Sequence, residues 1–308
     1  MDTVTLKLTK EQAGNIDLLA KIPASLSHIS QHDFGNGLIV SGKLSNMKVT
    51  ASERGVKIEN SLTKYYLGDN LQVMRRSDIE RAIEKISDEL HLPVKDAIAT
   101  RFDFAKNIPL RQGIENYLNY FGEISRYQRY PSKRGINYKI AGRELAIYDK
   151  IAELKHNRET VPEIYEGKNI MRIEKRYLNK VASYFNMPVI TGSHLFNEAF
   201  YIRVLNDWHN DYSRIDKLNN TVIDMSTVTT KRQLYSMGVL ALVQMQGGEI
   251  AAIKQVQERQ SKGELTKKQA LDLRNAIKAS SKERIKAKEN ELLNELEKKV
   301  KEAIIYYR

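Results

Sequence analysis

The spacing of apolar residues changes near residue 190, and this change constrains the fold more than any other feature of the chain. Before it, short segments alternate apolar and polar residues, which predicts half-buried β-strands. After it, the apolar residues recur at the helical period, and the stretch from Gly247 onward consists almost wholly of helix-forming residues. The sequence predicts an α+β fold with an antiparallel central sheet and flanking helices over residues 1–188, followed by a helical C-terminal region over 189–308.

The individual elements follow from the same patterns and from turn signals. Strands are expected at 2–9, 37–44, 47–51, 54–61, 95–107 and 169–178, with a hairpin over 136–150 that turns at Ala141 and Gly142. Helices are expected at 77–92, 112–124, 151–159, 193–208 and 231–245, and a helical hairpin is expected to break at Gly263 and Glu264. The segment around His28 and His32 is predicted to be a loop.

The charge of the chain favours a nucleic-acid partner. The formal net charge is +12, and residues 101–180 hold 17 Lys and Arg against 10 Asp and Glu, so more than half of the excess lies in about a quarter of the chain. A local basic surface is typical of phosphate binding, although a merely solvated surface can have the same composition. The chain has no cysteine, which excludes disulfides, thiol catalysis and zinc knuckles and fits a reducing cytoplasm.

Several classes of protein lose support. No apolar run approaches the roughly 18 residues that a membrane span needs, and the N-terminus is too polar for a signal peptide. The phosphate-binding loop of ATP-driven enzymes is absent, as are the dinucleotide and serine-hydrolase motifs. No His-x-His pair exists, and the six histidines are scattered.

Three predicted strands carry groups that could perform chemistry. Alternation places Arg101 and Asp103 on one face of the first strand, Tyr148 with Lys150 on one face of the second, and Arg172, Glu174 and Arg176 on one face of the third. If the strands join one sheet, two carboxylates suited to Mg²⁺ or Mn²⁺ would lie beside a tyrosine nucleophile. An acid beside an arginine is more often an ion pair, and a strand tyrosine more often packs, so these alternatives stay open.

Four segments, taken together, resemble the gene II/X family of replication proteins from filamentous phages and related plasmids. They are KIENSLTKYYLGDN (57–70), ATRFDFAKN (99–107), RELAIYDKIAEL (143–154) and IMRIEKRYLNKVASYFNMP (170–188). The resemblance implies an HUH-endonuclease-like fold and rolling-circle initiation. Such a protein nicks one strand at an origin, joins the 5′ phosphate through tyrosine, and later rejoins the strand.

The resemblance also implies roles for particular residues. Tyr148 would be the nucleophile and Lys150 the adjacent cation, while Asp103 and Glu174 would hold a Mg²⁺ or Mn²⁺ ion. Glu59 and Glu153 match further acidic positions of the family, and Glu59 is a third candidate metal ligand. The sequence departs from the wider group of nickases in lacking their His–apolar–His motif.

The expected partners are origin DNA, both single-stranded and supercoiled duplex, with host helicase and polymerase, in the cytoplasm of a bacterial host and without a membrane. The candidate DNA contacts are Lys64, Arg101, Arg126, Tyr127, Arg129, Tyr130, Lys133, Arg134, Arg172 and Arg176. A protein that binds an origin without cutting it is the first alternative, since a basic domain with a helical arm would suit that role too. An RNA-binding scaffold protein is a weaker alternative.

Overall fold

The computed structural model describes residues 1–308 except 34, 36, 219–227, 283–289 and 306–308. Its centre is a ten-stranded antiparallel sheet in the order β2-β3-β4-β5-β1-β6-β10-β9-β8-β7. The strands are β1 (Thr3–Thr9), β2 (Ser27–Asp33), β3 (Leu38–Leu44), β4 (Met47–Ser52), β5 (Gly55–Ser61), β6 (Ile98–Leu110), β7 (Gln128–Ser132), β8 (Gly135–Ile140), β9 (Arg143–Asp149) and β10 (Asn169–Tyr177).

Helices and short 3₁₀ turns connect the strands and continue after them. The helices are α1 (Leu18–Lys21), α2 (Leu62–Leu67), α3 (Arg76–Leu90), α4 (Ile114–Leu118), α5 (Lys150–His156), α6 (Val181–Tyr184), α7 (Glu198–Ser213), α8 (Lys231–Met245), α9 (Glu249–Ser261), α10 (Lys267–Lys282) and α11 (Glu291–Ile305). The 3₁₀ turns are η1 (Ile22–Ser25), η2 (Val94–Asp96), η3 (Glu163–Tyr165) and η4 (Gly192–Phe196).

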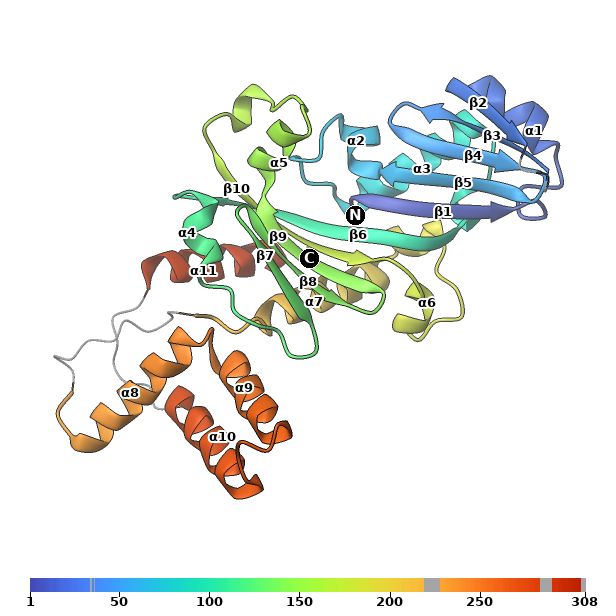
Figure 1. Cartoon of the computed structure of the whole chain (residues 1–308). Helices are drawn as coiled ribbons and strands as arrows, with labels where there is room; N and C mark the ends of the chain where they lie inside the picture. Colours follow the sequence, from blue (N-terminus) through green and yellow to red (C-terminus); the bar gives the residue numbers. More distant parts are fainter. Residues whose placement is uncertain (34, 36, 219–227, 283–289, 306–308) are drawn as a thin grey trace.

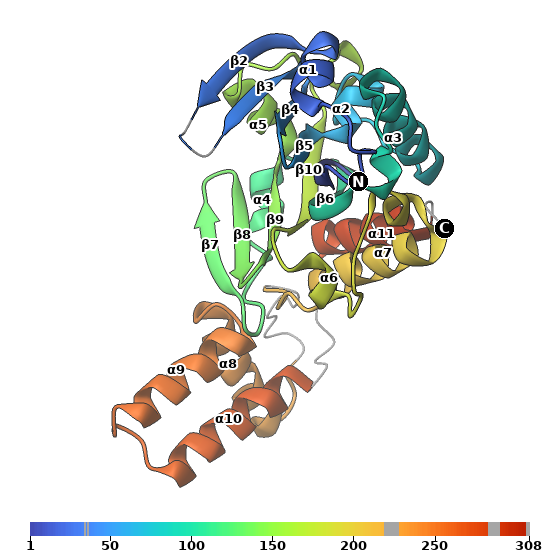
Figure 2. The same cartoon turned by 90° about the vertical axis from the view of Figure 1, so that its right-hand side faces the viewer.

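One face of the sheet packs against helices and forms the main core. Figure 2 shows α3, α7 and α11 on the same side of the strands. The buried stripe of α3 recurs every three to four residues, as an amphipathic helix requires, and Phe102 and Phe104 of β6 meet the aromatic side chains of α7. Trp208 of α7 also donates a hydrogen bond of 3.1 Å from Nε1 to the carbonyl of Ile173, which fixes the helix to the centre of the sheet.

The opposite face of the sheet carries polar side chains. One cross-strand row runs from Lys43 through Lys48, Glu59 and Thr5 to Arg101. The lysines of this row are exposed and the other three residues are half-buried. Because side chains of a strand alternate between faces, the apolar and polar residues of these strands are separated cleanly between the core and the polar face.

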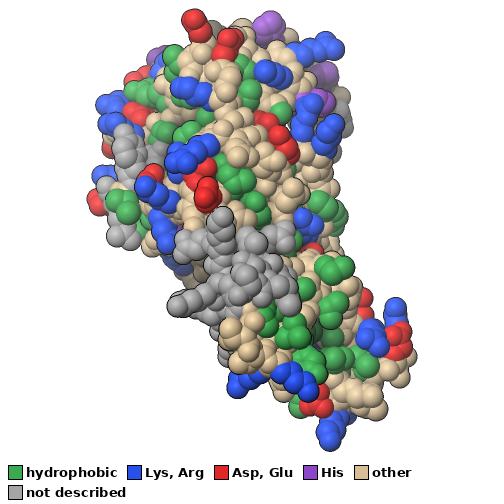
Figure 3. All heavy atoms as spheres, turned by 90° about the vertical axis from the view of Figure 1, so that its left-hand side faces the viewer, with side chains coloured by type: hydrophobic (Ala, Val, Ile, Leu, Met, Phe, Trp, Pro, Cys, Tyr) green, Lys and Arg blue, Asp and Glu red, His purple; other side chains and the backbone are tan. Residues whose placement is uncertain are grey.

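The helices after residue 213 do not all pack in one place. Helices α8, α9 and α10 share a small core of their own, made of Val243, Ala252, Val256, Ala270 and Ile277. They lie together at the lower end of the molecule in Figure 1. Figure 3 shows hydrophobic side chains gathered on the same lower end. Helix α11 instead returns to the main core through Leu296 and Val300.

The predicted fold class is confirmed, since an antiparallel sheet with flanking helices precedes a helical C-terminal region. The main core nevertheless extends past residue 188, because η4, α7 and α11 all contribute to it. The predicted loop around His28 and His32 is wrong, since both residues lie in the edge strand β2. All seven side chains of β2 are exposed, so the segment has no alternation that could have revealed it.

Among the described residues, no single helix combines the length and the apolar composition needed to cross a bilayer. Helices α8 and α9 reach those limits only as a pair, and they are bent by 84° at the break between them.

Candidate active site

Strands β6, β10 and β9 are neighbours, and their register brings three predicted site residues to the polar face of the sheet. Asp103 lies directly opposite Arg176, and Tyr148 lies directly opposite Arg172, so Glu174 sits diagonally between the two. The hydroxyl of Tyr148 donates a hydrogen bond of 3.0 Å to Oε2 of Glu174. The shared face is the one that strand alternation predicts.

Asp103 is 1% exposed and forms a two-point ion pair with Arg101, through contacts of 3.2 Å from Nε and 2.7 Å from Nη2. Burial raises the pKa of the Asp103 carboxyl to about 6; Arg101 opposes the rise, and the nearby charge of Glu174 adds to it. The carboxylate of Glu174 is therefore close enough to Asp103 to raise its pKa.

Glu174 is also buried and receives two charged partners. Arg176 donates to Oε2 at 2.9 Å and also contacts Glu144 at 3.3 Å, while Nη2 of Arg172 lies 3.9 Å from Oε1 of Glu174. The ion-pair alternative that the sequence left open thus describes both acids in this structure. A divalent cation would have to compete with Arg101 and Arg176 for the same oxygens.

The donor set nevertheless fits Mg²⁺ or Mn²⁺ in kind. Magnesium is commonly held by one or two carboxylates, with water and substrate phosphate completing its shell. Asp103 and Glu174 offer that number on one face. In the described part of the chain, no group of three or more His, Asp or Glu side chains is gathered to hold an ion.

Glu59 lies apart from this pair. It is in β5, which β1 separates from β6, and its carboxylate contacts Lys57 at 2.8 Å and Lys48 at 4.0 Å.

Tyr148 is partly exposed, but its hydroxyl lies among charged groups. Burial raises the pKa of the Tyr148 hydroxyl above its ordinary value; the Arg172 charge opposes the rise and the Glu174 charge adds to it. A phenol whose pKa is raised needs a proton acceptor before it can act as a nucleophile.

Lys150 does not occupy the position beside Tyr148 that was expected for it. It begins α5, is 1% exposed, and its Nζ lies 2.6 Å from Oε2 of Glu153. Arg172 is the cation that acts most strongly on Tyr148. Alternation along one strand cannot reveal this neighbour, because Arg172 faces Tyr148 from the adjacent strand β10.

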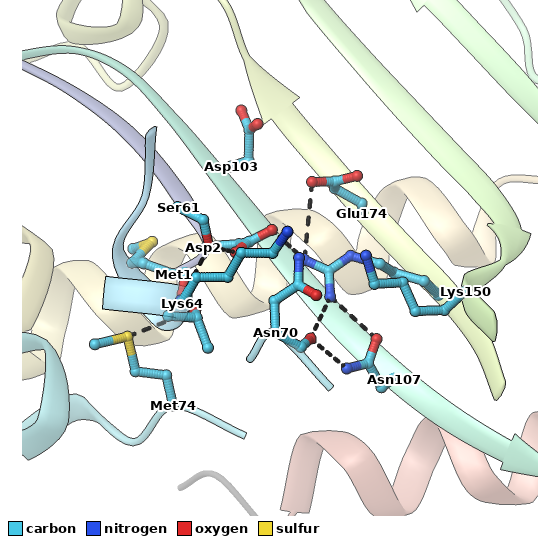
Figure 4. Close-up of polar contacts among 12 residues, drawn as sticks. Met1, Asp2, Ser61, Lys64, Asn70, Met74, Asp103, Asn107, Lys150 and Glu174 are labelled. Atoms are coloured by element: carbon cyan, nitrogen blue, oxygen red, sulfur yellow. Dashed lines mark hydrogen bonds and ion pairs between the residues drawn. The ribbon is translucent and has the colours of Figure 1, made fainter. Parts of the chain in front are cut away.

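The predicted contact between Arg172 and a DNA phosphate is corrected by the burial of this residue, which is 2% exposed. Its guanidinium forms an ion pair with Asp2 and donates to the Asn70 carbonyl at 3.0 Å and to Oδ1 of Asn107 at 3.1 Å. Asp2 in turn accepts a hydrogen bond of 2.6 Å from Ser61. Figure 4 shows Asp2, Asn70 and Asn107 grouped near Glu174. In the sequence, Asn107 could have been found only by continuing the alternation of the strand four residues past Asp103, which places both residues on the same face.

The predicted DNA contacts around β7 divide into exposed and buried groups. Arg126, Tyr130, Lys133 and Arg134 are exposed, and Tyr130 lies on the same face of the sheet as Glu174. Arg129 is half-buried, and it lies opposite Tyr138, which is buried in the core.

Two other predicted contacts are engaged elsewhere. Tyr127 cannot stack on a base, and this too is a correction: it is 8% exposed and its hydroxyl donates to Asp211 of α7 at 2.6 Å. Lys64 pairs with Glu159, and both side chains are about a third exposed or less.

A solvent-open hollow of about 360 Å³ adjoins Tyr148. The end of the β7–β8 hairpin and the face of α5 form its walls. Its lining includes Arg134, Gly135, Asn137, Tyr148, Glu153 and His156.

The family model for the N-terminal region of the replication-associated gene II protein matches residues 1–211. No curated protein matches the chain. The matched region holds the whole sheet, the three candidate site residues and most of α7. The resemblance seen in the four sequence segments is thereby confirmed, and the chain belongs to the gene II family of phage replication-associated proteins, which initiate rolling-circle replication.

Proposed function

We propose that this protein nicks and rejoins one strand of origin DNA by transesterification, through a 5′-phosphotyrosine on Tyr148. The observation that carries the proposal is the hydrogen bond of 3.0 Å between the Tyr148 hydroxyl and Glu174, on a face that also presents Asp103. A nicking enzyme needs a tyrosine hydroxyl beside a proton acceptor, whereas a protein that only binds DNA does not. Membership in a family of rolling-circle initiators supports the same reaction class.

The bonds balance without water. The Tyr148 oxygen loses its proton and forms a bond to phosphorus, the bond from phosphorus to the 3′ oxygen breaks, and the leaving 3′ oxygen takes one proton from solvent, so that no water is consumed. Glu174 is placed to accept the phenolic proton, since it already accepts the hydrogen bond from that group. Because the phosphodiester is kept as a tyrosine ester, a free 3′ hydroxyl can later reverse the step and rejoin the strand.

Asp103 and Glu174 would hold the Mg²⁺ or Mn²⁺ ion. Bound there, the ion would offset charge developing on the phosphate and lower the pKa of the nearby phenol. Arg176, which is about a quarter exposed and lines the hollow beside Tyr148, can turn from Glu174 toward a phosphate. The 3′ hydroxyl released at the nick would serve the host polymerase, and the host helicase would displace the strand.

The test is a denaturing gel of the protein with supercoiled origin DNA and either metal. We expect a covalent adduct with the wild type and none with Tyr148→Phe, while DNA affinity changes less than about twofold because only a hydroxyl is lost. Peptide mapping identifies the linked residue. An adduct on Tyr138 or Tyr177 would reassign the nucleophile, and no adduct on any tyrosine would reject the cutting reaction.

The second candidate is an initiator that binds the origin without cutting it. The ion pairs of Asp103 with Arg101 and of Glu174 with Arg176 favour it, because they give both acids a structural role. The two candidates differ in the adduct assay and in metal dependence, since the binding protein needs neither.

A further inference from the structure

The hollow beside Tyr148 differs from the rest of the site in how its polar groups are satisfied. Asp103, Glu174, Lys150 and Arg172 are all bound to other side chains. In contrast, the side chains that Arg134, Asn137 and His156 present to the hollow form no hydrogen bond or ion pair with any residue that the structure describes. These groups are free to meet a ligand.

The sheet register places Asn137 close to the reacting groups. Asn137 of β8 lies directly opposite Ala146 of β9, which in turn lies opposite Glu174. On the same face, Gly135 lies directly opposite Tyr148. A Cβ atom at Gly135 would come within 2.7 Å of the Tyr148 Cβ and 2.6 Å of the Ile147 carbonyl oxygen. Glycine at this position therefore lets β8 approach β9 closely beside the nucleophile, and Gly135 and Asn137 both line the hollow.

The size and chemistry of the hollow suit one unpaired nucleotide. Its volume of about 360 Å³ is at the lower end of the range for small-molecule sites and is too small for a duplex. An asparagine amide presents one donor and one acceptor group, which can pair with the edge of a base that has left its stack. An exposed arginine at the mouth matches a phosphate.

We infer that the hollow binds the unpaired nucleotide adjoining the scissile phosphate, with Asn137 contacting the base edge and Arg134 the phosphate. This inference rests on the proposed nicking function, and it adds that the protein selects sequence at one position beside Tyr148. His156 faces the same base from α5 and can donate or accept a hydrogen bond.

The experiment measures binding without cleavage, so that it is independent of the reaction. The full chain carrying Tyr148→Phe is incubated with a pool of single-stranded 20-mer DNA with randomised bases, and bound DNA is sequenced. We expect one position with a preferred base. Adding Asn137→Ala should reduce that preference at least fivefold while affinity for the whole pool falls less than about twofold. Asn137→Asp, which can only accept, should shift the preference toward cytosine.

Asn116→Ala on α4 is the matched control, since Asn116 is exposed and outside the hollow, and it should leave all preferences unchanged. Trp208 fluorescence checks that each variant is folded. Unchanged preferences in both Asn137 variants would overturn the inference, as would an equal loss of affinity for every sequence. If Asn137→Ala acts as expected but the wild type gives no covalent adduct, the nucleotide site stands and the proposed reaction falls.

Discussion

Asp103 makes the free energy of unfolding depend on pH, because burial raises the pKa of its carboxyl. Its folded pKa, raised to about 6, lies above the unfolded value near 4. Stability from this group is therefore fully present below pH 4 and is lost as pH rises through 6. The ionised carboxylate that a metal would need thus costs the protein stability at neutral pH, in the presence of Arg101, Glu174 and Arg176.

We predict that Asp103→Asn is at least as stable as the wild type at pH 7. From pH 4 to pH 7, the difference in free energy of unfolding between the two proteins should shift in favour of the variant by up to roughly 3 kcal/mol. The same variant should lose metal-dependent nicking. Urea denaturation at both pH values, followed by Trp208 fluorescence, gives the comparison. Equal destabilisation at both pH values would show that the ion pair with Arg101 outweighs the burial of Asp103.

Asp207 is a matched control for Asp103, because its pKa is shifted in the opposite direction. Burial acts to raise the pKa of Asp207, but Lys175 and the tyrosine hydroxyls around it bring the pKa below its ordinary value. Its contribution to stability is present above the unfolded pKa and is lost on acidification, so Asp207→Asn should destabilise the protein at pH 7.

At the scale of elements, a buried lysine joins β10 to α7. Nζ of Lys175 is 2.6 Å from a carboxylate oxygen of Asp207 and 2.6 Å from one of Asp211, and the side chain is 0% exposed. Lys175→Met would leave both acids without this partner, and we predict a loss of roughly 3–5 kcal/mol. Urea denaturation measures it.

Combining Lys175→Met with Asp207→Asn and Asp211→Asn should recover most of the lost stability, because the uncompensated charges are removed with their partner. If the triple variant is no more stable than Lys175→Met, packing of the lysine chain is responsible for the effect.

The exposed basic residues around β7 are expected to contact DNA phosphates. Arg126→Ala and Lys133→Ala should each weaken DNA binding uniformly across sequences and reduce the salt dependence of log affinity by about 1. The rate of adduct formation at saturating DNA should stay the same. Lys298→Ala on α11 serves as the control for removing one exposed lysine. Affinity that does not vary with salt in the wild type would contradict a phosphate-binding hairpin.

At the scale of the whole molecule, the C-terminal helices serve two different cores. Leu296 of α11 is fully buried in the core of the sheet, whereas Val256 of α9 is buried only among α8, α9 and α10. The chain has one tryptophan, and Trp208 lies in the core of the sheet. Its fluorescence therefore reports the unfolding of the sheet core alone.

We predict that Leu296→Ala lowers the free energy of unfolding seen by Trp208 by about 2–5 kcal/mol. Val256→Ala should change that free energy of unfolding by less than about 0.5 kcal/mol. Far-ultraviolet circular dichroism of this variant should nevertheless show a loss of helix at a lower denaturant concentration than in the wild type. Equal effects of the two substitutions on Trp208 would mean that the two cores unfold as one.

The sequence alone determined the fold class and most of the strands. Alternation in β6 and β10 separates the buried Phe102 and Ile173 from the polar residues beside them, so the faces of these strands could be predicted. It also showed that Asp103, Tyr148 and Glu174 could share one side of a sheet. The edge strand β2 could not be found, because a strand with neither face buried has no apolar pattern and depends on its neighbour.

Only the tertiary structure decided which side chains meet. Alternation gives the face on which a residue lies, but the register between strands far apart in the chain sets its cross-strand neighbour. That register placed Arg172 opposite Tyr148 and left Lys150 to Glu153. The packing of α7 buries Tyr127, which directly precedes β7 and which an isolated hairpin would expose. These contacts join segments that are remote in sequence, and their energies arise only when the sheet and its helices are assembled.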